Sequence, residues 1–190
     1  VTANITAVPT FSYGGVDCTG PSKIFTITVN PTGQVTQPLN QVICNTSAGN
    51  VTFTTVNGGG TTSYSWTNSN TSIGLPATGT GNISFTGTNA GTAPITGTIV
   101  VTPTFTNGGT NCPGPSKTFT ITVNPTGQVN QPADLVVCNG LTGNVAFTTV
   151  NTVGTTSYYW TNTNTSIGLA ADGTGPISFI AVNPGTAPVS

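Results

Sequence analysis

The chain has 190 residues, and the few that carry formal charge leave a net charge of −1. His, Arg, Glu and Met are absent. General acid–base catalysis at neutral pH normally uses His, a tuned carboxylate, Lys, Tyr or Cys, and nucleic-acid binding needs many positive charges on one surface. We therefore expect neither an enzyme nor a nucleic-acid-binding protein, and no metal ion or cofactor. The charged residues are Lys23, Lys117, Asp17, Asp134 and Asp172.

The sequence repeats itself with a period of 94 residues. Laying residues 1–96 over residues 95–190 without a gap gives 62 identical positions. A period this long corresponds to one small domain rather than to one turn of a solenoid. We expect a complete repeat at residues 32–125, the C-terminal strands of a preceding repeat at residues 1–31, and the N-terminal strands of a following repeat at residues 126–190. The recurring residues include Cys18, Lys23, Cys44 and Trp66, which return as Cys112, Lys117, Cys138 and Trp160.

Short strands are predicted throughout the complete repeat. Residues 117–123 alternate apolar Phe119, Ile121 and Val123 with Thr, the period-two pattern of a half-buried strand. Clusters of Gly and Asn separate such stretches. Because no convincing helix interrupts them, they predict an all-β, immunoglobulin-like β-sandwich in each repeat. The expected strands are 42–44, 51–56, 63–67, 83–86, 95–105 and 116–123, with a weaker one at 72–75.

The same short linker follows each of two repeats. The sequence VNPTGQV occurs at residues 29–35 and again at residues 123–129. Its Pro31 and Pro125 cannot extend a central strand, and a linker of a few residues that contains proline is semi-rigid. We therefore expect neighbouring repeats to stand in a line.

Two cysteines occur in each period, without any His or CxxC motif to complete a zinc site. They favour disulfides and an extracellular or cell-surface location, and no apolar run is long enough to insert in a membrane. Cys44 ends the first strand and Cys112 precedes the last, so we expect both at the same end of the sandwich, joined by a disulfide. Cys18 and Cys138 would then pair with neighbouring repeats or subunits.

An aromatic pair also recurs. Tyr64 and Trp66 lie two residues apart on one face of a strand, as do Tyr158 and Trp160. We expect these four side chains to fill the structural core, as the strand Trp does in many sandwiches. The alternative is an exposed platform that stacks on sugars, which would make the chain a carbohydrate- or surface-binding adhesin module.

Taken together, Tyr-x-Trp, the Cys of VICN and VVCN, GPSKTFTITVNP and GTAPITGTIVVTP resemble the PKD-like repeats of large surface and secreted proteins of Bacteroidetes-type bacteria. The resemblance covers nearly the whole period. It implies an immunoglobulin-like fold and a spacer, stalk or filament role outside the cell. The acidic FGDG turn that usually follows the Trp in this family is replaced by TNSNTS and TNTNTS, so no cation site of that turn is carried over.

Asparagine is abundant, and some of it falls in N-x-S/T sequons, the acceptor sequence of N-glycosylation. Sequons also arise by chance in a chain this rich in Asn and Thr. Glycosylation and contact with glycans therefore stay open as alternatives to a bare polypeptide. The candidate acceptors are Asn4, Asn45, Asn50, Asn70, Asn82 and Asn164.

These observations predict a structural repeat of an extracellular filament or adhesin stalk, a disulfide-stapled spacer whose partner is itself. Residues 1–31 and 126–190 add up to about one period. Two arrangements follow from this sum. Either the sequence is a slice of a longer repetitive polypeptide, or separate subunits complete one another by strand donation.

Overall fold

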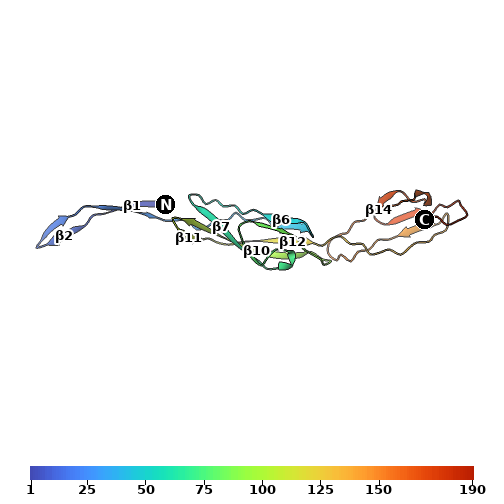
Figure 1. Ribbon diagram of the computed structural model, residues 1–190, viewed down its shortest axis with the longest axis horizontal. Helices are drawn as coiled ribbons and strands as arrows, with labels where there is room; N and C mark the ends of the chain where they lie inside the picture. The colour runs from blue at the N-terminus through green and yellow to red at the C-terminus, as the bar shows by residue number, and fades with distance from the viewer.

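The structure, a computed structural model, describes all 190 residues. The chain is all-β, which confirms the predicted class, and it forms an elongated molecule (Figure 1). Three parts follow one another along the long axis: a narrow ribbon at residues 1–31, a middle segment at residues 32–125 and a C-terminal segment at residues 126–190. The structure has no helix long and apolar enough to cross a membrane.

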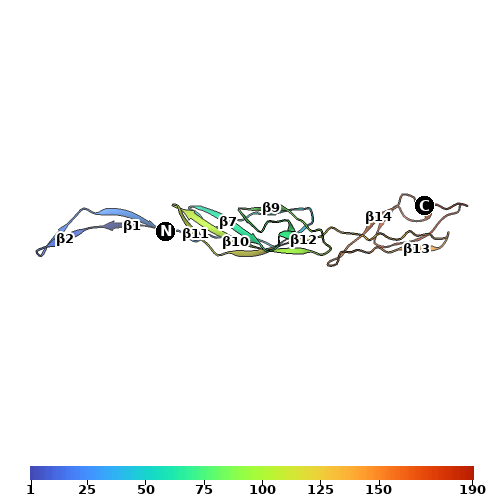
Figure 2. The same cartoon turned by 60° about the horizontal axis from the view of Figure 1, so that its bottom comes forward.

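The ribbon is a two-stranded antiparallel arm that projects from the middle segment (Figures 1 and 2). Its chain runs outward, turns at the tip and returns, so the N-terminus lies next to the middle segment. No third strand pairs with it. The outward strands are β1 (Thr2–Ala7) and β2 (Thr10–Tyr13), and the returning strands are β3 (Val16–Thr19) and β4 (Lys23–Thr28).

The middle segment has two β-sheets around one core, consistent with the expected β-sandwich. The large sheet has the order β5-β12-β10-β7-β8, with β11 also paired to β10, and the small sheet is β6-β9. All the pairs are antiparallel except β5 with β12, which is parallel. The strands of the large sheet are β5 (Gln41–Cys44), β7 (Thr61–Asn68), β8 (Thr78–Thr80), β10 (Ile95–Asn107), β11 (Thr110–Pro113) and β12 (Lys117–Asn124); the small sheet has β6 (Ala48–Val51) and β9 (Ile83–Thr86).

The core lies between these sheets and is supplied mainly by β10 and β12. Alternation along each strand turns its apolar residues to one face, and Ile99, Val101, Phe119, Ile121 and Val123 are all at most 2% exposed. They pack with Val51, Ile73, Leu75 and Ile83 from the other elements. The two central strands therefore carry much of the hydrophobic stabilisation of this segment.

Two of the expected strands differ in the structure. The strand predicted at residues 51–56 is instead β6, which ends at Val51. The stretch around Ser72–Leu75 begins with a 3-10 turn, η1 (Thr71–Ile73), because the Asn70 side chain accepts a hydrogen bond from Ser72 N. Gly74 ends η1 with φ of +92°, a conformation that favours glycine. Two strands, β8 and β11, are present beyond those expected.

The C-terminal segment repeats only part of this arrangement. It has two separate two-stranded sheets, β13-β16 and β14-β15, and one 3-10 turn. The counterparts of β10 and β12 are absent from this segment, since they would follow residue 188 in the repeat. Its elements are β13 (Thr142–Val145), β14 (Tyr159–Thr161), η2 (Thr165–Ile167), β15 (Asp172–Thr174) and β16 (Ile177–Ile180).

Candidate functional site: an open groove and an exposed ribbon

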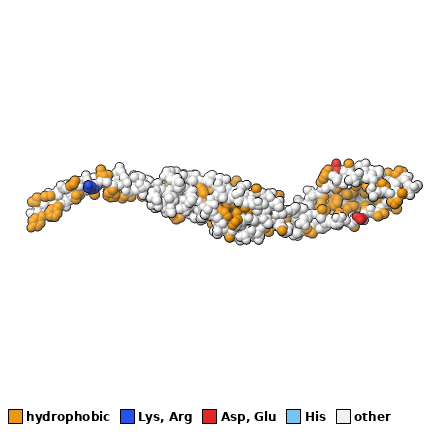
Figure 3. Space-filling model, viewed as in Figure 1, with side chains coloured by type: hydrophobic (Ala, Val, Ile, Leu, Met, Phe, Trp, Pro, Cys, Tyr) orange, Lys and Arg blue, Asp and Glu red, His pale blue; other side chains and the backbone are white.

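An apolar groove of about 520 Å³ is open along the C-terminal segment. Figure 3 shows it as a hollow in which hydrophobic side chains gather between the two strand pairs. Its apolar side chains come from the irregular stretch before β13, from β13, from η2 and the residues after it, and from β16 and the C-terminal stretch that follows. They include Leu135, Val137, Val145, Ile167, Leu169, Ile177 and Phe179.

The groove is lined by the counterparts of the middle segment's core. Val145, Ile167, Leu169 and Ile177 stand 94 residues after Val51, Ile73, Leu75 and Ile83. The earlier four are between 0% and 7% exposed, whereas the later four are only half-buried. The difference arises because β10 and β12 cover the first set and no strand covers the second.

The backbone around the groove is also unpaired. In the middle segment, β7 pairs with β10 along its whole length, from Thr61 to Asn68. Its counterpart at residues 155–162 is reduced to β14, which pairs only with β15. The counterpart of β5, residues 135–138, is not a strand at all. Residues 155–162 and 135–138 therefore lack the neighbouring strands that β7 and β5 have in the middle segment.

The N-terminal ribbon exposes the counterparts of residues that are buried on β12. Phe25, Ile27 and Val29 are 50%, 50% and 64% exposed. Their counterparts 94 residues later are Phe119, Ile121 and Val123 of β12, which are at most 2% exposed. Side chains that fill a core in the middle segment thus stand in solvent on the ribbon.

The ribbon already holds the register of the core strands. Ile5 pairs with Phe25 on the ribbon as Ile99 pairs with Phe119 in the middle segment. Phe11 pairs with Cys18 near the tip as Phe105 pairs with Cys112. The facing hydroxyl oxygens of Thr2 and Thr28 lie 3.1 Å apart, and those of Thr96 and Thr122 lie 2.8 Å apart.

A second hollow, of about 450 Å³, lies where the middle segment meets the C-terminal segment. Its lining includes Cys44, Asn124, Gly127, Asn151 and Gly154. Two of these are glycines beside which no atom lies within 4 Å of an added Cβ. Their counterparts Gly33 and Gly60 are tightly packed against β10 instead.

The linkers themselves are held by the same hydrogen bonds at both junctions. Asn57 donates from Nδ2 to Thr32 O at 3.1 Å and accepts at Oδ1 from Gln34 N at 2.6 Å. Asn151 donates to Thr126 O at 3.1 Å and accepts from Gln128 N at 2.8 Å. Sequence analysis did not single out these asparagines. Their recurrence at the same distance after each linker was the available signal.

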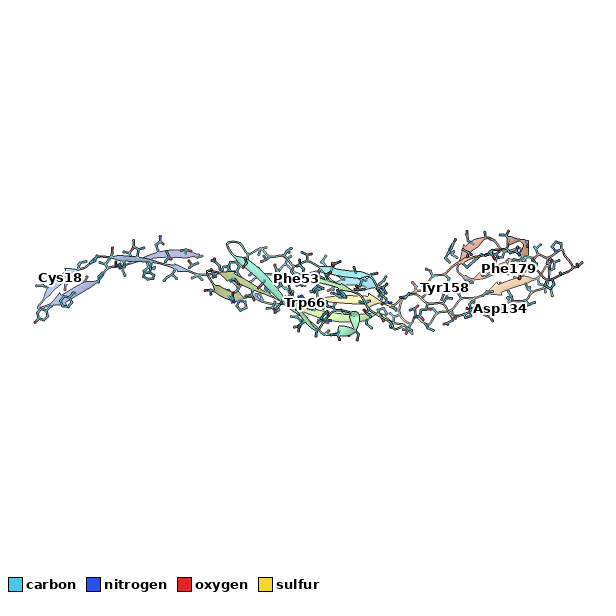
Figure 4. The ribbon with its side chains drawn as sticks, viewed as in Figure 1. Cys18, Phe53, Trp66, Asp134, Tyr158 and Phe179 are labelled. Atoms are coloured by element: carbon cyan, nitrogen blue, oxygen red, sulfur yellow. The ribbon has the colours of Figure 1, made fainter.

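The cysteine pairing expected from the sequence is corrected by the structure. Cys44 lies beside Asn124 at the C-terminal end of β12, because β5 runs parallel to β12. Cys112 lies beside Phe105, at the opposite end of β10. Cys44 and Cys112 are therefore separated by the length of the sheet, and all four thiols in the chain are free. Cys18 lies near the tip of the ribbon (Figure 4).

Tyr64 and Trp66 lie on β7, and Tyr158 and Trp160 lie at the equivalent positions of the C-terminal segment, with Trp160 on β14; Figure 4 labels Trp66 and Tyr158. Trp66 is 7% exposed and belongs to the core, with its ring against Gly79. Tyr64 is half-buried, and its ring centroid lies 5.4 Å from that of Phe53. Trp66 also lines a hollow of about 350 Å³ together with Thr78, Gly79 and Val100. Tyr158 and Trp160 are half-buried, and the ring centroid of Tyr158 lies 5.3 Å from that of Phe147.

The sequon asparagines divide into two groups. Asn45, Asn70 and Asn164 donate from Nδ2 to Thr126, Thr96 and Ser190 respectively. Asn4, Asn50 and Asn82 are exposed, and the side-chain oxygen of Asn82 accepts from Phe53 N. The amide nitrogens of this second group are the more accessible ones.

The remaining side chains offer little chemistry. The two lysines, Lys23 and Lys117, are exposed at the starts of β4 and β12, and no three His, Cys, Asp or Glu side chains stand together as metal ligands would. No model of a known protein family matches the chain, and no curated protein matches it. The groove, the ribbon and the two junctions are therefore the structural features that bear on function.

Proposed function

We propose that the chain is a structural repeat of an extracellular filament or adhesin stalk, built from tandem immunoglobulin-like, PKD-like sandwiches. The proposed role of each repeat is to act as a spacer that bears mechanical load. The observation that carries this proposal is the repeated junction, in which Asn57 and Asn151 clamp their linkers through the same hydrogen bonds. A spacer requires stiff connections, and the pair of hydrogen bonds shared by the two linkers supports this role.

Further contacts across the junctions support the same proposal. Asn30 and Asn107 exchange two hydrogen bonds of 2.9 Å between the ribbon's base and the β10–β11 turn. At the other junction, Thr152 N donates to Thr92 O at 3.0 Å. A semi-rigid proline linker tied on both sides transmits force along the axis rather than bending freely.

The near absence of charge suits this role. With five charged residues and no His, few attractions or repulsions are left for salt to screen. The polymer's cohesion then depends on hydrophobic burial and hydrogen bonds. We expect its length and shape to change little between low and high salt.

Immunogold electron microscopy of the producing cells tests the proposal, with antibodies raised against the whole chain. We expect labelled filaments or stalks outside the cell, with an axial repeat of roughly 40–50 Å, because β10 has 13 residues at about 3.4 Å each. Labelling confined to the cell interior would contradict the proposal.

The stiffness of the junctions is tested separately by the double variant Asn57→Ala and Asn151→Ala. Losing the clamps is expected to shorten the bending persistence length of purified filaments, measured by cryo-electron microscopy. A matched control is Asn111→Ala on β11, whose side-chain oxygen accepts from Thr106 within the same hairpin. An equal persistence length in the unchanged chain, the double variant and the control would contradict a stiffening role for these hydrogen bonds.

A further inference from the structure

We propose that the middle segment resists tension through a shear contact, the parallel alignment of its entry stretch, residues 33–45, with its exit stretch, residues 112–126. The inference deepens the proposed function and rests on it for the load itself. It names the residues that hold the repeat together when the chain is pulled along its axis. Both stretches lie inside the complete repeat, which has a linker at each end.

The two stretches run side by side over most of the segment. β5 pairs with β12 in parallel, and each of its register pairs joins residues 80 positions apart. Contacts that precede β5 keep nearly the same spacing. Gln37 Nε2 donates to Thr118 O, 81 positions away, and Gly33 N donates to Cys112 O at 3.0 Å. The parallel alignment therefore begins well before the short ladder of β5.

Side-chain amides add hydrogen bonds on both sides of that ladder. β5 has only four residues, so its backbone alone makes few bonds to β12. The amides of Gln37 and Asn40 precede β5, and that of Asn45 follows it. Each of them reaches the exit stretch. The bonds are Gln37 Nε2 to Thr118 O at 2.9 Å, Thr120 N to Asn40 Oδ1 at 2.9 Å, and Asn45 Nδ2 to Thr126 Oγ1 at 3.1 Å.

The shear contact is anchored in the hydrophobic core on one side. Val35 of the entry stretch is 7% exposed and belongs to the core, and Ile43 packs against it. On the exit stretch, Phe119, Ile121 and Val123 are at most 2% exposed. The core thus excludes water from one side of these hydrogen bonds, and a hydrogen bond is stronger in such surroundings than in water.

A strained residue fixes the end of the entry stretch. Thr46 has φ of +66° and is the one residue other than glycine with a positive φ, a conformation that is unfavourable for a β-branched side chain. Its N donates to Gly87 O at 2.8 Å, and the preceding Asn45 N donates to Asn124 O at 2.8 Å. Strain of this kind persists only where neighbouring contacts enforce it. These contacts hold Asn45 against the end of β12.

The direction of pull decides how these bonds are loaded. Tension enters the middle segment through the linker before Gly33 and leaves it through the linker after β12. The pull draws the entry stretch by its N-terminal end and the exit stretch by its C-terminal end. Because the two stretches are parallel, they are drawn past each other lengthwise. Tension therefore shears all the bonds between them together, rather than opening them one at a time.

Single-molecule force spectroscopy on the full chain tests the shear contact in two directions. In the first protein, DNA handles are attached through azide-bearing residues at Val29 and Val129, which are exposed in the two linkers, so that the contact is sheared. In the second, the handles are attached at Val29 and Lys117, the first residue of β12. This pair pulls both stretches by their N-terminal ends and peels them apart. At equal force, we expect unfolding to be at least about a hundredfold faster in the second protein, because its hydrogen bonds break singly. Equal rates would overturn the proposal.

Variants of Asn40 test the contribution of the side-chain amides. Asn40→Ala removes the acceptor for Thr120 N and should raise the unfolding rate under shear by about fivefold or more, since one hydrogen bond fewer resists the pull. Asn40→Asp keeps an oxygen acceptor, and Asp134 stands at this position of the following repeat. Its rate should stay within about twofold of the unchanged chain. An unchanged rate in Asn40→Ala would overturn the role assigned to this side chain.

Asn70→Ala separates resistance to tension from general stability. Asn70 caps η1, and its Nδ2 donates to Thr96 O at 3.2 Å, outside both stretches of the shear contact. This variant should lower the urea midpoint of the middle segment because it loses a cap. Its unfolding rate under shear should change by less than about twofold, since its contacts stay intact while the two stretches separate. A rate increase equal to that of Asn40→Ala would overturn the proposal, because the force measurement would then report overall stability.

The shear contact and the proposed function fail in different experiments. Equal unfolding rates in the two pulling directions would overturn the shear contact, and the proposed function would still stand on labelled filaments outside the cell. Labelling confined to the cell interior would contradict the proposed function, whereas the rates measured on the purified chain would be unaffected.

Discussion

The middle segment and the C-terminal segment have nearly the same sequence over their shared residues, yet they differ in structure. Both have the same local features: Asn70 and Asn164 cap their 3-10 turns, and Gly74 and Gly168 end them with φ of +92° and +91°. The strands, however, depend on partners. β5 exists only in the middle segment, and β7 is shortened to β14 in the other.

This difference separates two kinds of information in one repeat. Caps and turns depend on residues a few positions apart and form without any partner strand. The large sheet and the burial of the core depend on β10 and β12, which lie far along the sequence. Ile73 is fully buried beneath them, whereas Ile167 is half-buried without them. The C-terminal segment therefore forms its local turns, but it lacks the strands that cover the core in the middle segment.

The largest contrast is expected from truncating a core side chain and its ribbon counterpart. Ile121→Ala should destabilise the middle segment by about 2–5 kcal/mol, because it leaves a cavity beside Phe119 and Val123. Ile27→Ala should cost less than about 0.5 kcal/mol, because Ile27 is 50% exposed on the ribbon. Urea denaturation of each variant beside the unchanged chain measures both. Equal losses would mean that the ribbon is already packed in the monomer.

The next contrast concerns the glycine under each tryptophan. A Cβ on Gly79 would lie 2.1 Å from Cζ2 of Trp66, and one on Gly173 would lie 2.3 Å from Cζ2 of Trp160. Gly79→Ala should cost about 1–3 kcal/mol through overpacking. Gly173→Ala should cost less, because Trp160 is half-buried whereas Trp66 is 7% exposed and enclosed by the core.

Single-tryptophan proteins measure this second contrast. Trp160→Phe leaves the fluorescence of Trp66 to report on the middle segment, and Trp66→Phe leaves that of Trp160. The two glycine variants are compared in these backgrounds by urea denaturation. A larger effect at Gly173 than at Gly79 would show that the C-terminal segment is the more rigid of the two.

A smaller contrast is expected at a buried asparagine. Asn68 is 7% exposed and donates from Nδ2 to Leu75 O at 2.8 Å and to Asn70 O at 2.9 Å. Asn68→Ala should destabilise the middle segment by about 1–2 kcal/mol, since it leaves these carbonyls unsatisfied in the core. Asn162→Ala removes the same bonds from a half-buried site, where water replaces them. The same fluorescence measurement should show a clearly smaller loss.

The sequence predicted the all-β class and most strands of the middle segment, because alternation of Thr with Val, Ile and Phe is a local signal. Alternation does not report strand direction. The parallel pairing of β5 with β12 was therefore missed, and the pairing of Cys44 with Cys112 followed from that error. The stretch at residues 72–75 was assigned to a strand although Asn70 and Gly74 already contained the signals of a capped turn.

The residues that line the candidate site could be predicted from the sequence. Each residue that lines the groove stands 94 positions after a residue of the middle segment, so the repeat alone identifies its lining once that core is known. The sequence could not show the pairing register of the ribbon or the exposure of its apolar side chains. That register and the exposure of Phe25 and Ile27 come from strand packing between residues some 20 positions apart.

The smallest effect is expected from pH and concerns Tyr64. Burial raises the pKa of the Tyr64 phenol above 10.0, and a side-chain hydrogen bond with Thr55 offsets part of that rise. The folded middle segment therefore holds this proton more tightly than the unfolded chain does. The stability that Tyr64 contributes is fully present below about pH 10, and it is lost as the pH rises through the raised pKa of the folded state. Urea denaturation should accordingly show a decline in stability above pH 10 that Tyr64→Phe diminishes. An undiminished decline in Tyr64→Phe would assign the loss to other groups and show that the Tyr64 site is as open to water as the groove.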